Sequence, residues 1–217
     1  MERSVIEYMP QALELAKLAW GRTSPNPMVG ALIVKHDRII GRGYHRKAGT
    51  PHAEINALAD CRHSPAGATL YVTLEPCSTY GRTPPCTDAI IKAGISRVVI
   101  GCLDPNPKHA GKGVEILRRA GIEVEYPVLE EECLRLNEAF FKWITTGTPF
   151  VLLKMAMTLD GKIATVDGDS QWVTGVGARE EVQVLRQWAD AIMVGGETAR
   201  RDHPALTVRN EIGRAHV

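Results

Sequence analysis

Three side chains in this sequence could hold a metal ion, and a fourth could move protons beside it. One imidazole, His52, is followed by two thiols, Cys77 and Cys86, and this ligand set suits Zn²⁺. Three protein ligands leave the fourth tetrahedral position for water, which distinguishes catalytic zinc sites from closed structural ones. Glu54 is not needed as a ligand and lies two residues from His52. The pattern predicts a catalytic zinc site with Glu54 as general acid and base.

The spacing of these residues narrows the class of zinc site. Zinc deaminases of nucleobases carry an H-x-E segment and, downstream, a P-C pair whose cysteine is followed closely by a second one. Here eight residues, Ser78 to Pro85, separate the two cysteines. A zinc-stabilised interaction module is the alternative, because Cys and His at such spacings are commonly structural. Cys61, Cys102 and Cys133 have no neighbouring ligand motif, so the ligand count and Glu54 favour catalysis.

Composition excludes several other function classes. The 217 residues include 26 Lys and Arg against 25 Asp and Glu, a net charge of +1, so no basic field predicts nucleic-acid binding. The sequence has no apolar run of membrane-spanning length and no signal peptide, so we expect no membrane association. Five cysteines, two of them assigned to metal, argue against a disulfide framework and for a cytoplasmic location.

Hydrophobic periodicity predicts alternating helices and strands around the four chemical residues. A helix over 6–20 should become regular only from Pro10, because proline removes a helical hydrogen bond. Two apolar runs, 30–34 and 39–43, predict a β-hairpin. A helix opening at Pro51 places His52 and Glu54 in its first turn, and a second helix opens at Cys86. The remaining predicted elements are strands over 70–74, 98–101 and 122–126 and helices over 113–120 and 130–144. This order predicts a three-layer α/β/α sandwich.

The polar segment 145–149 predicts a boundary between two domains. Beyond it we expect a strand over 150–157, a helix over 177–189 and a strand over 191–194. The last seven residues, 211–217, match a translated reading frame of a widely used sequencing adapter, and we expect them to be a non-native tail.

Several longer motifs point to one family. They are Pro25-Asn26-Pro27, Gly43-Tyr44-His45, His52-Ala53-Glu54, Thr73-Leu74-Glu75-Pro76-Cys77-Ser78, Gly81-Arg82-Thr83-Pro84-Pro85-Cys86, Asp104-Pro105-Asn106-Pro107, Leu159-Asp160-Gly161-Lys162, Ser170-Gln171-Trp172-Val173-Thr174 and 202–209. In these the chain resembles the bifunctional deaminase/reductases of riboflavin biosynthesis, from about residue 9 to 209. Thr79 departs from the histidine common in that family after Cys-Ser.

For the first part, residues 1–146, the resemblance implies a cytidine-deaminase-like α/β/α domain. Its reaction would be zinc-dependent hydrolysis of the 2-amino group of 2,5-diamino-6-(5-phosphoribosylamino)pyrimidin-4-one. The metal ligands would be His52, Cys77 and Cys86, and Glu54 would be catalytic. The positions that match substrate-binding residues are Asn26, His45 and Arg82.

For residues 150–210 the resemblance implies the beginning of a dihydrofolate-reductase-like α/β domain that reduces the ribosyl group with NADPH. Positions matching NADPH contacts are Ala156, Trp172, Thr198 and Asp202; positions matching substrate contacts are Lys154, Ser170, Arg186, Leu206 and Arg209. These 61 residues are too few for a reductase domain of ordinary size, so we expect no reductase activity from them.

A nucleotide or tRNA zinc deaminase is the second alternative. Neutral charge and the lack of a basic, aromatic surface stripe argue against tRNA. The expected partner is a phosphoribosylated pyrimidine, and the sequence leaves self-association open.

Overall fold

A computed structural model describes residues 3–80, 84–106 and 109–209, and Arg82 and the tail 211–217 therefore lie outside the described residues. The chain divides into two compact units, Met1–Phe150 and Val151–Val217. No helix in the described ranges is both long enough and apolar enough to cross a membrane.

The first unit is built on a mixed five-stranded sheet in the order β2-β1-β3-β4-β5. The strands are β1 Gly30–Lys35, β2 Arg38–Tyr44, β3 Thr69–Leu74, β4 Arg97–Cys102 and β5 Glu123–Glu125. β1 is antiparallel to both β2 and β3, whereas β3, β4 and β5 are parallel. The predicted hairpin is confirmed: β1 and β2 are joined by His36 and Asp37, both with positive φ, as tight hairpin turns require.

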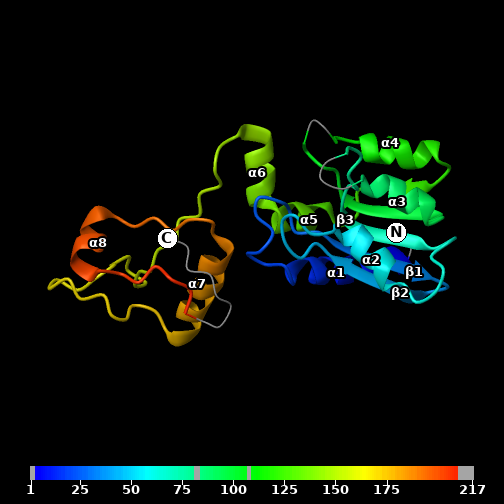
Figure 1. The fold of residues 1–217 in the computed structure, drawn as a ribbon. Helices are drawn as coiled ribbons and strands as arrows, with labels where there is room; N and C mark the ends of the chain where they lie inside the picture. Colours follow the sequence, from blue (N-terminus) through cyan, green and yellow to red (C-terminus); the bar gives the residue numbers. More distant parts are fainter. Residues whose placement is uncertain (1–2, 81–83, 107–108, 210–217) are drawn as a thin grey trace. The chain divides into compact units, whose positions relative to one another are not determined.

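Helices cover both faces of this sheet (Figure 1). One face packs against α2 Ala53–Asp60, α3 Cys86–Lys92 and α4 Lys112–Arg119 through a core that includes Ile33, Val72, Ile90, Ile100 and Leu117. The other face packs against α1 Arg3–Lys17 and α5 Glu130–Leu136 through residues such as Met9, Leu13, Leu32, Val99 and Leu136. The predicted three-layer α/β/α sandwich is therefore confirmed.

Two helix predictions were wrong in detail. α1 is already helical from Arg3 and continues through Pro10. The turn before Pro10 is held because Tyr8 and Met9 are buried, and Tyr8 donates a hydrogen bond to the Asp37 carbonyl at 3.1 Å. The predicted helix over 130–144 is two helices, α5 and α6 Glu138–Thr146, separated at Asn137. The Asn137 side chain breaks the helix because it bonds the backbone N–H and carbonyl of Met28, both at 2.8 Å.

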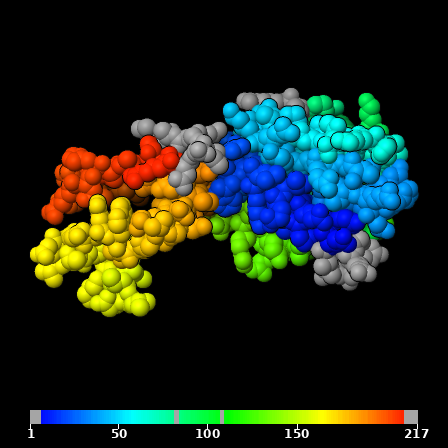
Figure 2. Space-filling model, turned by 90° about the horizontal axis from the view of Figure 1, so that it is seen from below, coloured from blue at the N-terminus to red at the C-terminus, as the bar shows by residue number. Residues whose placement is uncertain are grey.

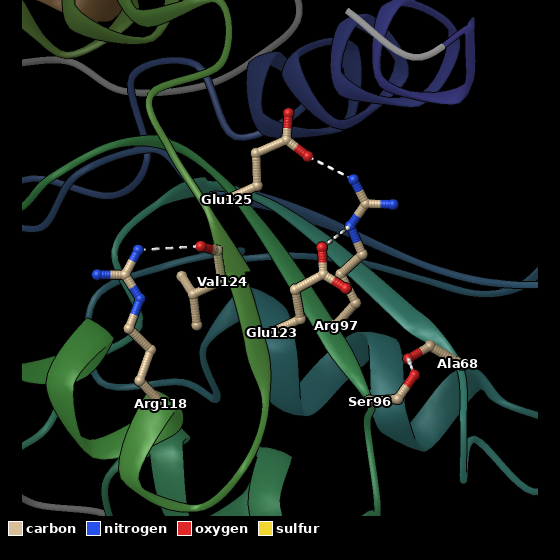
Figure 3. A network of polar contacts seen from close by, with 7 residues as sticks. All are labelled: Ala68, Ser96, Arg97, Arg118, Glu123, Val124 and Glu125. Carbon is tan, nitrogen blue, oxygen red and sulfur yellow. Dashed lines mark hydrogen bonds and ion pairs between the residues drawn. The ribbon is translucent and has the colours of Figure 1, made fainter.

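Strand β5 forms one edge of the sheet and is flanked by charged side chains (Figure 3). Arg97 on β4 pairs with Glu125 at 2.5 Å and with Glu123 at 3.5 Å. Arg118 donates to the carbonyl of Val124 at 3.1 Å. Charges along an exposed edge disfavour pairing with a strand of another molecule, which supports β5 as the true end of this sheet.

The second unit contains α7 Val176–Trp188 and α8 Gly196–Asp202. Helix α7 confirms the helix predicted over 177–189. The strands predicted over 150–157 and 191–194 are wrong for this structure, where both segments run without β pairing. A strand requires a hydrogen-bonded neighbour, and no ladder forms among the described residues of this unit. The yellow residues of this unit are visible at the surface in the space-filling view (Figure 2), and most side chains of 151–165 are exposed.

Candidate active site

The three predicted metal ligands come together at the C-terminal end of β3, the central strand of the sheet. His52 is the residue that precedes α2, Cys77 follows β3, and Cys86 is the first residue of α3. The His52 Nδ1 atom lies 3.5 Å from the Cys77 sulfur and 3.3 Å from the Cys86 sulfur. The ligand atoms of all three residues lie within 4.8 Å of one another. Local structure therefore brings a helix start, a strand end and a second helix start to one point.

Glu54 lies in the first turn of α2 beside this cluster. Its side chain is buried, with 3% of the residue exposed, and its carboxyl shares a hydrogen bond with Cys86. The pKa of Glu54 is raised to about 7, mainly because burial disfavours the charged carboxylate and also because the Cys77 sulfur is close. A carboxyl group so placed can exchange a proton near neutral pH.

The two thiols differ in their environment. The pKa of Cys77 is lowered to about 4, first because the Cys86 thiol donates a hydrogen bond to its sulfur and further because His52 does the same. The backbone N–H of Cys86 also donates to the Cys77 sulfur, at 3.2 Å. The pKa of Cys86 is raised because its proton is shared with Cys77 and because it is buried. Cys77 is thus prepared as a thiolate, the form that binds metals.

The donor set fits zinc. One imidazole nitrogen and two sulfurs converge, and this is the one group of three such side chains found among the described residues. Soft thiolates with imidazole select zinc over magnesium or calcium, which prefer oxygen ligands. The buried Glu54 adjoins the cluster without being required as a ligand, which is the arrangement of a catalytic site.

Asn26 and His45, predicted to bind substrate, form a hydrogen-bonded pair next to the cluster. The Asn26 amide nitrogen lies 3.1 Å from His45 Nε2, and His45 Nδ1 lies 3.1 Å from the Pro51 carbonyl. The rings of buried His45 and of His52 form a T-shaped pair with 5.3 Å between their centroids. Burial lowers the pKa of His45, which favours its neutral form.

The residues predicted to contact NADPH or the reductase substrate are spread over the second unit. Arg186 on α7 donates to the carbonyls of Ala205 and Thr207, each at 3.0 Å, and so holds the segment that contains Leu206. The Arg209 backbone N–H bonds Gln183 at 3.0 Å. Trp172 lies 4.5 Å from the guanidinium of Arg179. Lys154 and Ala156 lie in the segment 151–157, which is not part of a strand, Ser170 precedes the turn at Trp172, and Thr198 and Asp202 are on α8.

Sequence reasoning missed one buried acidic residue at this end of β3. Glu75 immediately precedes the Pro76-Cys77 pair and accepts three backbone hydrogen bonds from the segment 104–113. The same segment brings His109 Nδ1 to 3.5 Å from the Ser78 hydroxyl. The available signal was the position of Glu75: a carboxylate directly after an apolar strand has to be satisfied by donors from elsewhere.

Comparison with known proteins places two family descriptions on the chain. Residues 2–102 match the cytidine and deoxycytidylate deaminase zinc-binding region, and residues 149–216 match the RibD C-terminal domain.

Curated relatives match nearly the whole chain. The riboflavin biosynthesis protein RibD of Aquifex aeolicus is 57% identical over 93% of this chain and 57% of its own length. The Escherichia coli protein of the same name is 50% identical over 93% of this chain and 55% of its own length. The chain thus spans little more than half the length of these relatives.

Solved structures of riboflavin-pathway deaminases are also similar to this chain. A Thermotoga maritima diaminohydroxyphosphoribosylaminopyrimidine deaminase/5-amino-6-(5-phosphoribosylamino)uracil reductase has a TM-score of 0.93 and 50% identity, covering 97% of this chain and 61% of that one. The Aspergillus oryzae Rib2 deaminase in complex with DARIPP has a TM-score of 0.53 and 26% identity, covering 64% of this chain and 93% of that one.

Proposed function

Because this chain belongs to the RibD family of riboflavin biosynthesis proteins, we propose that its first domain is a zinc-dependent hydrolytic deaminase. The observation that carries the proposal is the buried Glu54 carboxyl beside the His52, Cys77 and Cys86 cluster. The domain bounds that we propose are 1–146 for the deaminase and 150–210 for the beginning of the reductase, followed by a non-native tail, 211–217.

The proposed substrate is 2,5-diamino-6-(5-phosphoribosylamino)pyrimidin-4-one. Water replaces its 2-amino group, giving ammonia and 5-amino-6-(5-phosphoribosylamino)uracil. The Thermotoga relative is named for a deaminase activity of this kind, and the Aspergillus Rib2 deaminase was solved with DARIPP. The position of Asn26 and His45 beside the metal cluster supports the proposal that these two residues hold the pyrimidine. Arg82 is proposed to contact the phosphate.

His52, Cys77 and Cys86 would hold the zinc ion. When bound, zinc supplies the Lewis acidity that makes water a competent nucleophile near neutral pH. Glu54 accepts one proton from the attacking water and passes it to the ring nitrogen. It then takes the remaining proton from the added hydroxyl and passes it to the departing amine, so that the ring carbon becomes a carbonyl and ammonia leaves as a neutral molecule. The burial of Glu54 suits both steps because it raises the pKa of the carboxyl to about 7, where the group can both accept and release a proton near neutral pH.

In the whole protein, the second domain would reduce the ribosyl group of the deaminated product with NADPH. Proposed NADPH contacts are Ala156, Trp172, Thr198 and Asp202, and proposed substrate contacts are Lys154, Ser170, Arg186, Leu206 and Arg209. We propose that the residues present in this chain do not suffice for that reaction, because the described residues of the second unit include no paired strand to build a cofactor cleft.

The metal ligands and the proton carrier can be separated by mutation. Glu54→Gln should keep one zinc per chain but lower kcat by at least about a hundredfold, in line with the usual contribution of general acid–base catalysis. Cys77→Ser and Cys86→Ser should lose zinc and activity together. Zinc content by atomic emission and ammonia release from the purified chain measure the two effects. Cys61→Ser, which changes a cysteine outside the cluster, is the matched control and should retain both.

The substrate assignment has its own test. Ammonia release from the phosphoribosylated pyrimidine should be far faster than from cytidine, deoxycytidylate or a tRNA anticodon loop. Equal turnover of one of these three would favour the nucleotide or tRNA deaminase alternative.

Two other results would contradict the proposed function. Near-normal turnover by zinc-loaded Glu54→Gln would show that Glu54 does not have its proposed role. A zinc-loaded wild type with no activity on any of these substrates would favour an interaction module.

A further inference from the structure

At the end of β3, next to the metal cluster, the Glu75 side chain accepts three backbone hydrogen bonds. The residue is buried, with 4% exposed, at the point where β3 ends. Its Oε2 atom accepts hydrogen bonds from the backbone N–H groups of Asp104 at 3.1 Å and Gly111 at 2.9 Å, and its Oε1 atom accepts from Gly113 at 2.8 Å. One carboxylate therefore fixes three points of a segment that lies about thirty to forty residues further along the chain.

In a second contact, Gly113 of the same segment packs closely against Pro76, just after the end of β3. Gly113 lies so close that a β-carbon built on it would be 2.4 Å from the Pro76 carbonyl oxygen and 3.0 Å from Glu75 Oε1. A side chain at this position would force the start of α4 away from Pro76. The hydrogen bonds of the Glu75 carboxylate and the lack of a side chain at Gly113 thus both allow the start of α4 to lie close to Pro76.

This contact lies next to the metal cluster. Pro76 is followed directly by the ligand Cys77 and then by Ser78, whose hydroxyl faces His109 at 3.5 Å. The side chain of Asp104, at the other end of the segment, is buried and accepts from the Asn106 backbone N–H at 2.8 Å. Residues 104–106 and 109–113 therefore lie beside the strand end that supplies a zinc ligand.

We propose that Glu75 is a positioning residue of the deaminase, which holds residues 104–106 and 109–113 against the Cys77-Ser78 strand end, so that they form one wall of the substrate site before substrate binds. This inference rests on the proposed function. Glu75 itself touches neither metal nor substrate in this role. Its effect passes through the backbone of Asp104, Gly111 and Gly113.

This role requires a group that only accepts hydrogen bonds. An ionised carboxylate offers two acceptor oxygens, whereas a glutamine amide offers one oxygen and one NH₂ donor. In Glu75→Gln the NH₂ group has to face at least one backbone N–H, which loses its partner in a buried place. The segment should then move freely although the size of the side chain is unchanged.

The first experiment uses the zinc-loaded chain and its Glu75→Gln variant. Amide hydrogen exchange of Asp104, Gly111 and Gly113 should be at least about tenfold faster in the variant, with one zinc per chain retained. KM for the phosphoribosylated pyrimidine should rise roughly tenfold, with a smaller change in kcat, because the wall contributes to binding more than to proton transfer. Glu115→Gln is the matched control, since Glu115 is an exposed residue of α4, the helix that begins beside Glu75.

Gly113→Ala tests the same contact without altering the carboxylate. It should reproduce the faster exchange and the raised KM, and it keeps the proposal testable if Glu75→Gln does not fold. Glu115→Gly, which places a poor helix former at an exposed position of α4, controls for a general loss of helix stability.

Two results would overturn the proposal. One is unchanged exchange in the two test variants; the other is faster exchange with wild-type kcat and KM. An inactive zinc-loaded wild type would instead overturn the proposed function and this inference with it, whereas active wild type with equally active variants overturns this inference alone.

Discussion

At the scale of single residues, the pair formed by Asn26 and His45 shows how hydrogen bonds assign roles to polar groups. The Pro51 carbonyl can only accept, so His45 Nδ1 has to carry the proton that points to it. His45 Nε2 then has a lone pair and accepts from the Asn26 amide nitrogen. This arrangement turns the Asn26 side-chain oxygen, an acceptor, into the atom suited to a substrate amino group. The sequence contained both residues but could not reveal that they are partners.

The pKa of Cys61 provides a second test at this scale. Burial raises it from its ordinary value, and the nearby charge of Asp60 raises it further. A raised thiol pKa means less thiolate at a given pH, so alkylation of Cys61 at pH 8.5 should be several times slower than in the urea-unfolded chain and should catch up only as the pH passes its raised pKa. Iodoacetamide labelling of the zinc-loaded chain, followed by peptide mass spectrometry, measures this. Equal rates in folded and unfolded protein would contradict the assigned environment.

At the scale of elements, the sequence predicted those that depend on local patterns. The hairpin, the start of α2 at the metal ligand and the α/β/α order all follow from apolar periodicity and turn residues. The errors arose where a distant contact decides local structure. Asn137 ends α5 because it bonds the backbone of Met28, which is 109 residues away, and no window around Asn137 contains that partner. The Glu75 contacts were missed for the same reason.

Gly43 is the element-scale position on which the active site depends most directly. A β-carbon there would lie 2.3 Å from the Ala53 carbonyl oxygen and 2.2 Å from the Ala57 nitrogen, both in the backbone of α2. Backbone atoms cannot rotate away, so Gly43→Ala should shift α2 together with His52 and Glu54 at its start. We expect a loss of about 1–3 kcal/mol in unfolding free energy and zinc binding weaker by roughly tenfold or more.

Urea unfolding and zinc competition with a chelator would measure both effects of Gly43→Ala. Gly177→Ala in α7 is the matched control, because no atom lies within 4 Å of the added carbon. It should leave zinc affinity unchanged. Wild-type zinc affinity in Gly43→Ala would show that α2 can adjust without moving His52.

At the scale of the whole molecule, burial differs sharply between the two units. The first unit contains every buried apolar residue of the described chain, among them Leu32, Ile33, Val98 and Leu117. No described residue of 151–209 is buried. Large apolar side chains of that unit are instead exposed, such as Leu153 at 79%, Met193 at 92% and Trp172 at 66%. Stability from apolar burial is therefore concentrated in the unit that carries the metal cluster.

Limited proteolysis should separate these two levels of stability. Trypsin cleaves after Lys and Arg, and Lys154 and Lys162 lie in exposed chain without regular structure, whereas the arginines of β4 and α4 belong to the packed domain. Cleavage of the zinc-loaded chain should therefore begin beyond residue 150 and leave a resistant fragment ending in the segment 151–162. That fragment should keep its zinc and its ammonia release at the rate of the intact chain, because every proposed deaminase residue, including those that Glu75 positions, precedes residue 114. Neither the intact chain nor the fragment should oxidise NADPH in the presence of the deaminated uracil product, since the described residues of the second unit present no paired strands and no buried side chains to form a cofactor cleft. Mass spectrometry of the fragments, metal analysis and absorbance at the NADPH band measure the three outcomes. Product-dependent NADPH oxidation by the purified chain, or early cleavage within β1 to α4, would contradict this division of stability and function.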